Sequence, residues 1–305
     1  MYTDYDVIII GSGSAGLAAG IYTSRAGFST LIMEKKTMGG ELMNIQLIEN
    51  YPGFANGVMG PDLASAMLEQ ASNAGAEVEI GEVTAIKSKS GIKTVRTDDQ
   101  TLTCKGVILA TGSHTKKLKV PGEEKLANRG VFYCATCDGA QSAGKPVVVA
   151  GAGDSALTDA LYLAKLGCKV TILGRSLPRA SKVLLDRAEA NPNIEIKCGI
   201  KIESIVGDDW VTGVDYEDTA TGTKSRLEVA GIYIRIGMVP NTQFLEDSLE
   251  LGPGGLIPVN ENMETAIPGI YAAGDVRVNS PAQIATSVGD GVTAAMAIGQ
   301  YINSL

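Results

Sequence analysis

Two cysteines separated by two residues are the part of this sequence best suited to chemistry. Cys134 and Cys137 are followed directly by Asp138 in the run Cys-Ala-Thr-Cys-Asp. Thiols at this spacing can close a small disulfide ring, and such an environment lowers a thiol pKa enough to supply the thiolate needed for disulfide exchange. A structural zinc site needs four ligands, but the chain has no second Cys-x-x-Cys and only one histidine. We therefore predict a redox role for the pair and no metal site.

The remaining cysteines and the histidine carry no comparable signal. Cys104, Cys168 and Cys198 stand singly in or beside strand-like segments, where a buried thiol behaves as a small hydrophobic side chain. His114 lies near two lysines between the two halves of the chain, and we interpret it as a surface or hinge residue. A total of five cysteines is odd, which fits a reducing compartment better than a secreted disulfide scaffold.

The elements that must position the cysteine pair start with two units of strand, glycine turn and helix. The apolar segment 6–10 runs into Gly11-Ser12-Gly13-Ser14-Ala15-Gly16, then into a small-residue helix and a strand that ends at Glu34. The apolar segment 146–150 runs likewise into the glycine turn 151–156, a helix and a strand over 169–173. A glycine-rich turn in this context is typical of dinucleotide binding. The sequence therefore predicts two nucleotide-binding domains.

The first glycine turn has all the parts of a dinucleotide site. Its glycines permit a tight turn and close backbone approach, so that a pyrophosphate can rest on the helix N-terminus. Glu34 would accept hydrogen bonds from ribose hydroxyls and exclude a 2′-phosphate, which leaves FAD or NAD as the ligand. Asp275, which ends the apolar strand 269–273 in a Gly274-Asp275 pair, favours FAD because it can hold a ribityl hydroxyl or a flavin phosphate. The alternative role for Asp275 is a helix N-cap.

The order of the segments predicts an interrupted domain. Each unit is followed by a further apolar strand with a glycine end, at 106–112 and 231–237. The last strand and the mostly helical tail from Ala282 have no phosphate loop of their own, so they would complete the first domain. We expect an α/β fold with two Rossmann-like, three-layer domains, the second inserted in the first and carrying the cysteine pair. The predicted boundaries are 1–115 and 244–305 for the first domain and 116–243 for the second, with hinge crossings at 116–121 and 240–244.

Bulk composition limits the partners. The chain has 305 residues, of which 45% are hydrophobic and 20% charged, and this suits a globular protein with two cores. Its formal charge of -8 argues against nucleic acid or an anionic membrane as the main partner. No apolar run reaches the roughly 18 residues that cross a bilayer, and residues 1–6 lack the pattern of a signal peptide. We predict a cytoplasmic protein.

The motifs occur together in an order that resembles the low-molecular-weight thioredoxin reductases. The resemblance covers the whole chain and implies an FAD domain, an inserted pyridine-nucleotide domain and a homodimer. It also implies that reduced FAD passes electrons to a Cys134–Cys137 disulfide, with Cys137 nearer the flavin. Cys134 would be the thiolate that attacks the disulfide of a thioredoxin-like partner, and Asp138 the acid that moves the proton. The matching segments are 11–16, 39–40, 49–53, 110–112, 134–138, 151–156, 240–242 and 272–276.

The same resemblance assigns the residues that hold FAD. Gln283 falls where the family places an Arg-Gln-Ala segment beside the flavin, but Ala282 here replaces the Arg. The predicted FAD-binding residues are Gly11, Gly13, Ser14, Ala15, Gly16, Glu34, Gly40, Glu41, Asn50, Ala110, Thr111, Gly112, Gly274, Asp275, Gln283 and Ile284.

The second nucleotide site departs from the family pattern. Relatives that use NADPH carry a His-Arg-Arg run and a later Arg, which together hold the 2′-phosphate. Here Arg175 and Arg179 remain, in a loop with shorter spacing that contains Pro178, and no Asp or Glu replaces the lost groups to select NAD. Thr158 stands in place of a Glu near the nicotinamide, and Met238 in place of a His. The candidate nicotinamide-nucleotide residues are Gly151, Gly153, Asp154, Ser155, Ala156, Arg175 and Arg179.

These departures leave the electron donor open. NADPH bound through Arg175 and Arg179, NADH, and a donor that is no pyridine nucleotide are all compatible with the sequence. In the last case the donor would be ferredoxin, an acidic protein that could dock on the basic runs at 35–36 and 116–119, or the enzyme would be a dithiol oxidase that delivers electrons to oxygen. The alternative outside enzymes is a flavin-binding module without turnover, but an intact Cys-x-x-Cys-Asp argues against it.

Overall fold

The chain forms two compact units that are interleaved in sequence. The computed structural model describes residues 2–45, 47–245 and 248–305, so positions 1, 46, 246 and 247 of the predicted first domain lie outside the described residues. The first unit contains Met1–His114 and Val239–Leu305, and the second, Thr115–Met238, is inserted between these parts. These units divide at 114/115 and 238/239, whereas the domain boundaries predicted from the sequence are 115/116 and 243/244. Among the described residues, no helix is long and apolar enough to cross a membrane.

The first unit is built on a parallel sheet that carries the first glycine turn. β1 pairs in parallel with β2 and β6, β2 pairs with β3, and β17 pairs with β6. Val7, Ile8 and Ile9 of β1 have no exposed surface, because the strand has a neighbour on each side and a packed layer on each face. The strands are β1 (Tyr5–Ile10), β2 (Thr30–Glu34), β3 (Glu77–Ile80), β4 (Val83–Lys89), β5 (Ile92–Thr97), β6 (Thr101–Leu109) and β17 (Ile270–Ala272).

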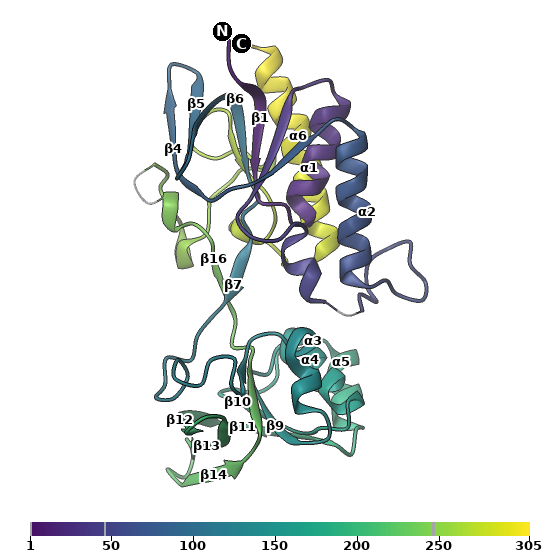
Figure 1. Ribbon diagram of the computed structural model, residues 1–305, viewed down its shortest axis with the longest axis vertical. Helices are drawn as coiled ribbons and strands as arrows, with labels where there is room; N and C mark the ends of the chain where they lie inside the picture. Colours follow the sequence, from purple (N-terminus) through teal and green to yellow (C-terminus); the bar gives the residue numbers. More distant parts are fainter. Residues whose placement is uncertain (1, 46, 246–247) are drawn as a thin grey trace. The chain divides into compact units, whose positions relative to one another are not determined.

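Helices cover one face of this sheet, and antiparallel strands lie over the other. Figure 1 shows α1, α2 and α6 side by side on the helical face. β4 and β5 continue from β6 as antiparallel strands and enclose a second apolar layer together with Leu245 and Ile257. The helices are α1 (Ser14–Arg25), α2 (Gly60–Asn73) and α6 (Ile284–Asn303), and the 3-10 helices are η1 (Gly40–Asn44), η3 (Gln243–Leu245), η4 (Pro253–Gly255) and η5 (Gly274–Val276).

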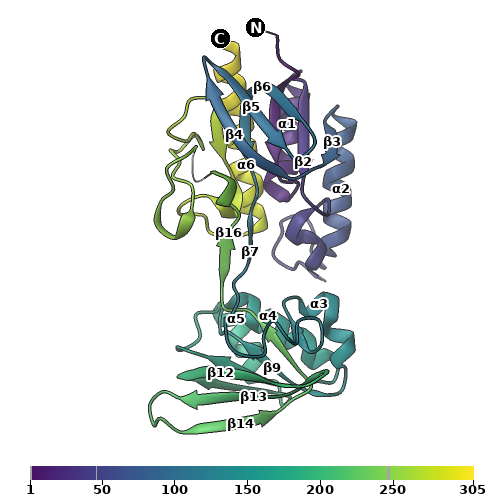
Figure 2. The same cartoon turned by 60° about the vertical axis from the view of Figure 1, so that its left-hand side comes forward.

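The second unit repeats this plan. Its parallel sheet has the order β11-β10-β9-β15-β8, and a separate antiparallel sheet contains β12, β13 and β14 (Figure 2). Val149 packs with Leu163 of α4 on the helical side, whereas Val148 packs with Val214 of β13 on the other side. The predicted α/β fold class with two Rossmann-like halves is confirmed. The elements are β8 (Val131–Phe132), α3 (Ala135–Asp138), η2 (Gly139–Ser142), β9 (Pro146–Ala150), α4 (Asp154–Lys165), β10 (Lys169–Gly174), α5 (Lys182–Glu189), β11 (Ile194–Cys198), β12 (Ile200–Gly207), β13 (Val211–Asp218), β14 (Lys224–Glu228) and β15 (Gly231–Ile234).

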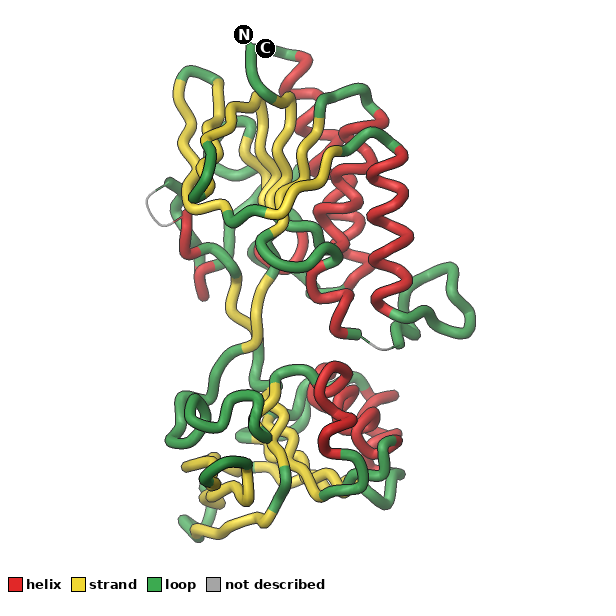
Figure 3. Tube along the Cα trace, viewed as in Figure 1, coloured by secondary structure: helices red, strands yellow, loops and turns green. Residues whose placement is uncertain are grey.

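Two short strands connect the units. β7 (Ser113–Thr115) and β16 (Met238–Pro240) pair with each other as a two-stranded sheet (Figure 3). Asn241 fastens the end of β16, since its backbone N–H donates to Gly112 O at 3.0 Å and its amide donates to Thr111 O at 2.8 Å. His114 Nδ1 lies 2.7 Å from Asn241 Oδ1. His114 is exposed in a connecting strand, so its predicted surface or hinge position is confirmed.

Candidate active site

Cys134 and Cys137 form a disulfide at the start of α3. Their Cα atoms lie 5.4 Å apart, a normal separation for a bridged pair. Cys134 is the N-cap of α3, and its Sγ accepts a hydrogen bond from the Cys137 N–H at 3.1 Å. Cys137 is exposed and Cys134 is half-buried. The predicted disulfide is therefore present, and a thiolate formed at Cys134 would have a backbone donor beside it, which favours the charged form.

The redox segment rests on a packed base in the second unit. Its continuation η2 lies so close to α4 that a Cβ at Gly139 would meet the Tyr162 ring at 3.0 Å. Behind it, the Tyr233 hydroxyl donates to Ser142 Oγ at 3.0 Å, and the Cys168 thiol donates to Ser142 O at 3.1 Å. These contacts fix the backbone that follows the disulfide.

The three other cysteines are free thiols. Cys104 and Cys168 are buried, and Cys198 is half-buried. Burial raises the pKa of Cys104 to about 12 and raises the pKa of Cys168 above its ordinary value. Both thiols therefore stay protonated near neutral pH and act as packing residues, in agreement with the structural role predicted for them.

Asp138 ends α3 and is the carboxyl group nearest to the disulfide in sequence. It is half-buried, and burial raises the pKa of its carboxyl group. The Gln141 amide donates to Asp138 Oδ1 at 3.3 Å. A carboxyl group with a raised pKa holds a proton closer to neutral pH, and this suits the acid predicted at Asp138.

The first glycine turn has one position that faces open space. A Cβ at Gly11 would meet Ala110 O at 2.2 Å and one at Gly16 would meet Gly11 O at 1.9 Å, so packing requires both glycines. A Cβ at Gly13, by contrast, would meet no atom of the described residues within 4 Å. Gly13 is also the N-cap of α1, a position at which no described side chain caps the helix. Free backbone N–H groups next to open space fit a pyrophosphate.

Other predicted segments converge on this turn. A Cβ at Gly40 would lie 3.2 Å from Gly13 Cα, and one at Gly274 would lie 3.1 Å from Ala15 Cβ. Ala110, the first residue of the predicted segment 110–112, supplies the carbonyl oxygen that a Cβ at Gly11 would meet. The structure thus brings residues from four separate parts of the sequence to one place in the first unit, and the spaces between them suit a ligand with backbone contacts rather than a bulky side chain.

Glu34 ends β2 as expected, but it also holds the turn itself. Its Oε2 accepts hydrogen bonds from the Ser12 N–H at 2.9 Å and from the Ser12 hydroxyl at 2.8 Å. Its Oε1 accepts a hydrogen bond from the Lys36 N–H at 3.1 Å. The ribose contact predicted for Glu34 is thus joined by bonds within the turn that no local pattern in the sequence indicates. A carboxylate has about four lone-pair sites, so Glu34 can still accept from ribose hydroxyls.

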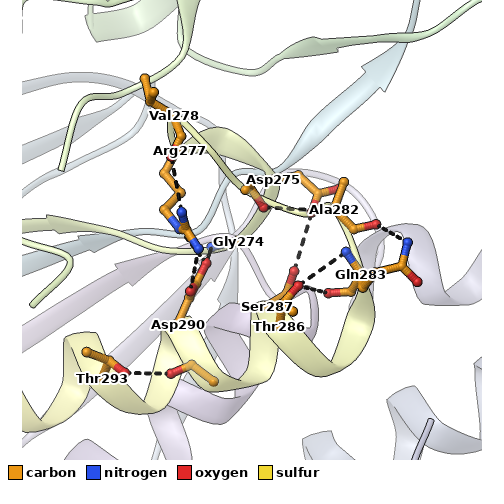
Figure 4. Close-up of polar contacts among 12 residues, drawn as sticks. Gly274, Asp275, Arg277, Val278, Ala282, Gln283, Thr286, Ser287, Asp290 and Thr293 are labelled. Carbon is orange, nitrogen blue, oxygen red and sulfur yellow. Dashed lines mark hydrogen bonds and ion pairs between the residues drawn. The ribbon is translucent and has the colours of Figure 1, made fainter. Parts of the chain in front are cut away.

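A buried ion pair holds the Gly274-Asp275 segment (Figure 4). Asp290 Oδ2 accepts hydrogen bonds from the Gly274 N–H at 3.1 Å and from Arg277 Nε at 2.7 Å, and Oδ1 accepts from Arg277 Nη2 at 2.9 Å. Burial raises the pKa of Asp275, and the nearby carboxyl groups of Glu41 and Asp290 raise it further. Arg277 and Asp290 belong to no recognised motif, so the sequence alone does not predict their part in this segment.

The start of α6 brings Asp275, Gln283 and Asn50 into one region of the first unit. Asp275 Oδ1 accepts a hydrogen bond from Ser287 Oγ at 3.3 Å (Figure 4). The N-cap of α6 is Gln283, so the helix begins at Ile284 and the alternative that Asp275 caps it is wrong. Asn50 Nδ2 donates to Gln283 Oε1 at 3.0 Å. This contact places the predicted flavin residues Asn50 and Gln283 side by side.

The second glycine turn repeats the open geometry of the first. A Cβ at Gly151 would meet Arg235 O at 2.0 Å, whereas one at Gly153 would meet no described atom within 4 Å. α4 begins directly after this open position. The loop that follows β10 folds over the turn, where the Ser181 N–H donates to Asp154 Oδ1 at 2.6 Å. A pyrophosphate would fit the open backbone at this turn of the second unit.

The residues that would select a nicotinamide nucleotide lie in that folded loop. Arg175 and Arg179 are both exposed. The Arg179 N–H donates to Ala152 O at 2.9 Å, which holds the loop against the turn and leaves both guanidinium groups at the surface. At the start of α4, Ser155 is exposed and Ala156 is buried.

The basic runs proposed as a dock for an acidic protein are partly neutralised. Lys35 Nζ lies 2.5 Å from Glu82 Oε1 in the first unit. Lys117 Nζ lies 3.4 Å from Glu124 Oε1 in the second unit. Each pair is exposed, so each lysine loses part of its attraction for an acidic partner without being buried.

Comparisons with known proteins agree with this geometry. A family model for pyridine nucleotide-disulphide oxidoreductases matches residues 5–291. The chain is 41% identical over 303 residues to the thioredoxin reductase of Bacillus subtilis, covering 99% of this chain and 96% of that protein. Among solved structures, it is similar to Lactococcus lactis thioredoxin reductase, with a TM-score of 0.96 and 39% identity over 99% of this chain and 100% of the other. It is also similar to T. acidophilum thioredoxin reductase, with a TM-score of 0.94 and 37% identity over 98% and 99% of the two chains.

Proposed function

Because the chain belongs to the pyridine nucleotide-disulphide oxidoreductase family, we propose that it is an FAD-dependent thioredoxin-disulfide reductase. The observation that carries this proposal is the Cys134–Cys137 disulfide at the start of a helix, in a chain similar to thioredoxin reductases over nearly its whole length. Electrons from a donor pass through FAD to the disulfide and leave on a thioredoxin-like protein. A flavin-binding module without turnover would have no use for such a pair.

The first domain, residues 1–115 and 244–305, is proposed to hold FAD, which supplies the two-electron carrier when bound. Gly13 and the N-terminus of α1 receive the pyrophosphate, and Glu34 accepts hydrogen bonds from ribose hydroxyls. Asp275, whose pKa burial raises, binds a ribityl hydroxyl. The other proposed FAD-binding residues are Gly11, Ser14, Ala15, Gly16, Gly40, Glu41, Asn50, Ala110, Thr111, Gly112, Gly274, Gln283 and Ile284.

The second domain, residues 116–243, performs the disulfide exchange. Two electrons and one proton convert the disulfide into a Cys134 thiolate and a Cys137 thiol. Cys134 Sγ attacks one sulfur of the partner disulfide, which forms a mixed disulfide and releases a partner thiolate. Asp138, the acid of this sequence, gives its proton to the released partner thiolate and takes up the proton of Cys137. The Cys137 thiolate then attacks Cys134 Sγ, restores the disulfide and frees the reduced partner. The raised pKa of Asp138 suits a group that takes up and returns this proton.

For the electron donor we propose NADPH, bound at the second glycine turn. The open space at Gly153 and the N-terminus of α4 suit a pyrophosphate, and the exposed Arg175 and Arg179 can contact a 2′-phosphate. The candidate residues Gly151, Asp154, Ser155 and Ala156 complete this site. NADH, reduced ferredoxin and a dithiol oxidase that uses oxygen are the alternatives. The ion pairs of Lys35 and Lys117 weaken the case for ferredoxin.

The family resemblance also supports a homodimer that works in the cytoplasm. Three free thiols, two of which are buried, fit a reducing compartment better than a secreted disulfide scaffold.

An anaerobic flavin titration tests the proposal. The absorbance of the purified protein is followed while NADPH, NADH or reduced ferredoxin is added, and oxidised thioredoxin is added afterwards. We expect NADPH to bleach the flavin and thioredoxin to restore its colour. If only reduced ferredoxin bleaches the flavin, ferredoxin is the electron donor, and the proposed reduction of thioredoxin still stands. A colourless protein that releases no flavin on denaturation and takes up none would contradict the whole proposal.

A further inference from the structure

A buried ion pair lies beneath the redox segment and has no part in the steps above. Arg235, which follows β15, and Asp159 of α4 are joined by an Nε–Oδ2 contact of 2.6 Å, and their side chains are only 13% and 9% exposed. The Asp159 carboxylate also accepts a backbone hydrogen bond from Ala135. Ala135 is the first residue of α3, directly after the N-cap Cys134. One carboxylate therefore ties the redox helix to the strand end at Arg235.

The other titratable groups around this pair favour their neutral forms. Burial raises the pKa of Tyr233 to about 12 and raises the pKa of the Cys168 thiol. Burial also raises the pKa of Asp138, at the far end of α3. The guanidinium of Arg235 counteracts the effect of burial on Asp159. Charges act over longer distances in a poorly solvated interior. An ion pair joined to Ala135, the residue directly after Cys134, can therefore influence the disulfide.

We propose that Asp159 and Arg235 are positioning residues that set the reduction potential of the Cys134–Cys137 pair. Reduction by two electrons and one proton leaves a thiolate, so a nearby charge changes the energy of the reduced form relative to the disulfide. The Arg235 charge stabilises that thiolate, and the Asp159 charge destabilises it. The inference rests on the proposed function only because it takes this cysteine pair as the redox centre.

The test is a redox titration of the full chain against dithiothreitol, read by alkylation of Cys134 and Cys137 and mass spectrometry. Asp159→Asn leaves the Arg235 charge alone and should favour the reduced form about tenfold, a rise of about 30 mV for a two-electron couple. Arg235→Gln leaves a carboxyl group that either stays charged, which lowers the potential, or takes up a proton, which leaves it unchanged. The double variant Asp159→Asn/Arg235→Gln carries neither charge and should titrate like the wild type.

Matched controls come from a surface pair of the same unit. Arg226 Nε and Asp215 Oδ1 lie 2.6 Å apart on neighbouring strands, with side chains 49% and 33% exposed. Arg226→Gln and Asp215→Asn should leave the potential unchanged, because solvent screens these charges. The readout needs neither flavin nor thioredoxin, so a failure of the proposed function would not alter it.

A further variant tests the same effect if Asp159→Asn does not fold. Asp159→Asn leaves an unpaired buried charge, which is strongly destabilising. Asp159→Asn/Arg235→Lys keeps a positive charge on a flexible side chain that can reach water, where the charge is partly screened, so its rise should have the same direction but be smaller than in Asp159→Asn. An unchanged or lower potential in Asp159→Asn would overturn the inference, and so would a lower potential in the charge-retaining variant. So would a rise in Arg235→Gln, because a common direction for both losses means altered packing rather than charge.

Discussion

Glu123 accepts a hydrogen bond from the Tyr133 hydroxyl at 2.7 Å, and Tyr133 directly precedes Cys134 in sequence. Glu123 is 1% exposed. Its carboxylate also accepts hydrogen bonds from the backbone N–H groups of Leu118 at 3.0 Å and Lys119 at 2.5 Å. A single buried acid therefore connects the crossing segment after β7 with the start of the redox segment.

Tyr133→Phe should lower the free energy of unfolding by about 1–3 kcal/mol, because it removes a hydrogen bond to a buried charged group. Burial raises the pKa of Tyr133, and the bond to Glu123 raises it further. The folded state therefore keeps this proton above about pH 10, where the unfolded chain releases it. The stabilisation is complete below about pH 10 and declines at higher pH, so the deficit of the variant should shrink there. Urea denaturation at several pH values measures this.

The control for that measurement is Tyr22→Phe, because Tyr22 is 47% exposed on α1. Its free energy of unfolding should stay within about 0.5 kcal/mol of the wild type, as is usual for surface positions. If Tyr133→Phe lowers the free energy of unfolding by the same amount across pH 8–12, the pKa of the Tyr133 phenol is not raised in the folded state.

Gly13→Ala should weaken FAD binding at least about tenfold, or about 1.4 kcal/mol, without destabilising the protein that lacks FAD. The backbone φ of Gly13 is -68°, which alanine adopts freely, and the added Cβ would meet no described atom within 4 Å. The methyl group would instead occupy the space proposed for the pyrophosphate. Fluorescence titration of the apoprotein with FAD gives the affinity, and thermal denaturation gives the stability.

Two matched substitutions separate ligand contact from packing. Gly153→Ala makes the same change at the second glycine turn and should leave FAD affinity unchanged. Gly16→Ala would drive a Cβ to 1.9 Å from Gly11 O and should destabilise the protein even without ligand. Equal FAD affinity in Gly13→Ala and the wild type would show that the pyrophosphate does not bind next to Gly13.

Local patterns in the sequence predicted most of the architecture, whereas contacts between distant segments could not be predicted. The turns at Gly11 and Gly151 were recognisable because a strand, a glycine turn and a helix follow one another directly along the chain. The bond between Asn50 and Gln283 joins positions separated by 233 residues, and no local pattern records such a contact. The open space at Gly13 also depends on the distances between packed segments, because the glycines of the turn look alike in sequence.

Asp138→Asn should slow thioredoxin reduction by about 100-fold or more, the usual contribution of a positioned acid or base. The same substitution should increase the free energy of unfolding relative to the wild type. Burial raises the pKa of Asp138, so the folded state favours the neutral carboxyl group. That preference stabilises the fold fully below about pH 3.9, the pKa of an unfolded Asp, and is lost as the pH rises through the folded pKa. Asn stays neutral, so the variant should gain stability relative to the wild type between pH 4 and 7. A variant that is less stable at pH 7 than at pH 4, relative to the wild type, would contradict this account.

Single serine substitutions should separate the roles of the two cysteines. Cys134→Ser should leave flavin reduction by the donor intact and abolish thioredoxin reduction, because the attacking thiolate is lost. Cys137→Ser should instead accumulate a mixed disulfide between Cys134 and thioredoxin, since no resolving thiol remains. Nonreducing electrophoresis detects that adduct, and Cys198→Ser, which removes a free half-buried thiol, should behave as the wild type. Cys137 is the more exposed of the pair, so an adduct in Cys134→Ser rather than in Cys137→Ser would exchange the two roles.

Arg175→Ala should erase most of the preference for NADPH over NADH, because we propose that its exposed guanidinium contacts the 2′-phosphate. The ratio of kcat/KM for the two nucleotides measures this preference, and the loss should be about tenfold, or about 1.4 kcal/mol. Added salt should also reduce the preference of the wild type for NADPH over NADH, because it screens exposed charges. Lys169→Ala removes the same charge at the opposite end of β10 and should leave the ratio unchanged. If millimolar NADPH and NADH both fail to reduce the flavin while reduced ferredoxin succeeds, the loop held over Ala152 and Asp154 no longer serves a nucleotide, and the donor is a protein.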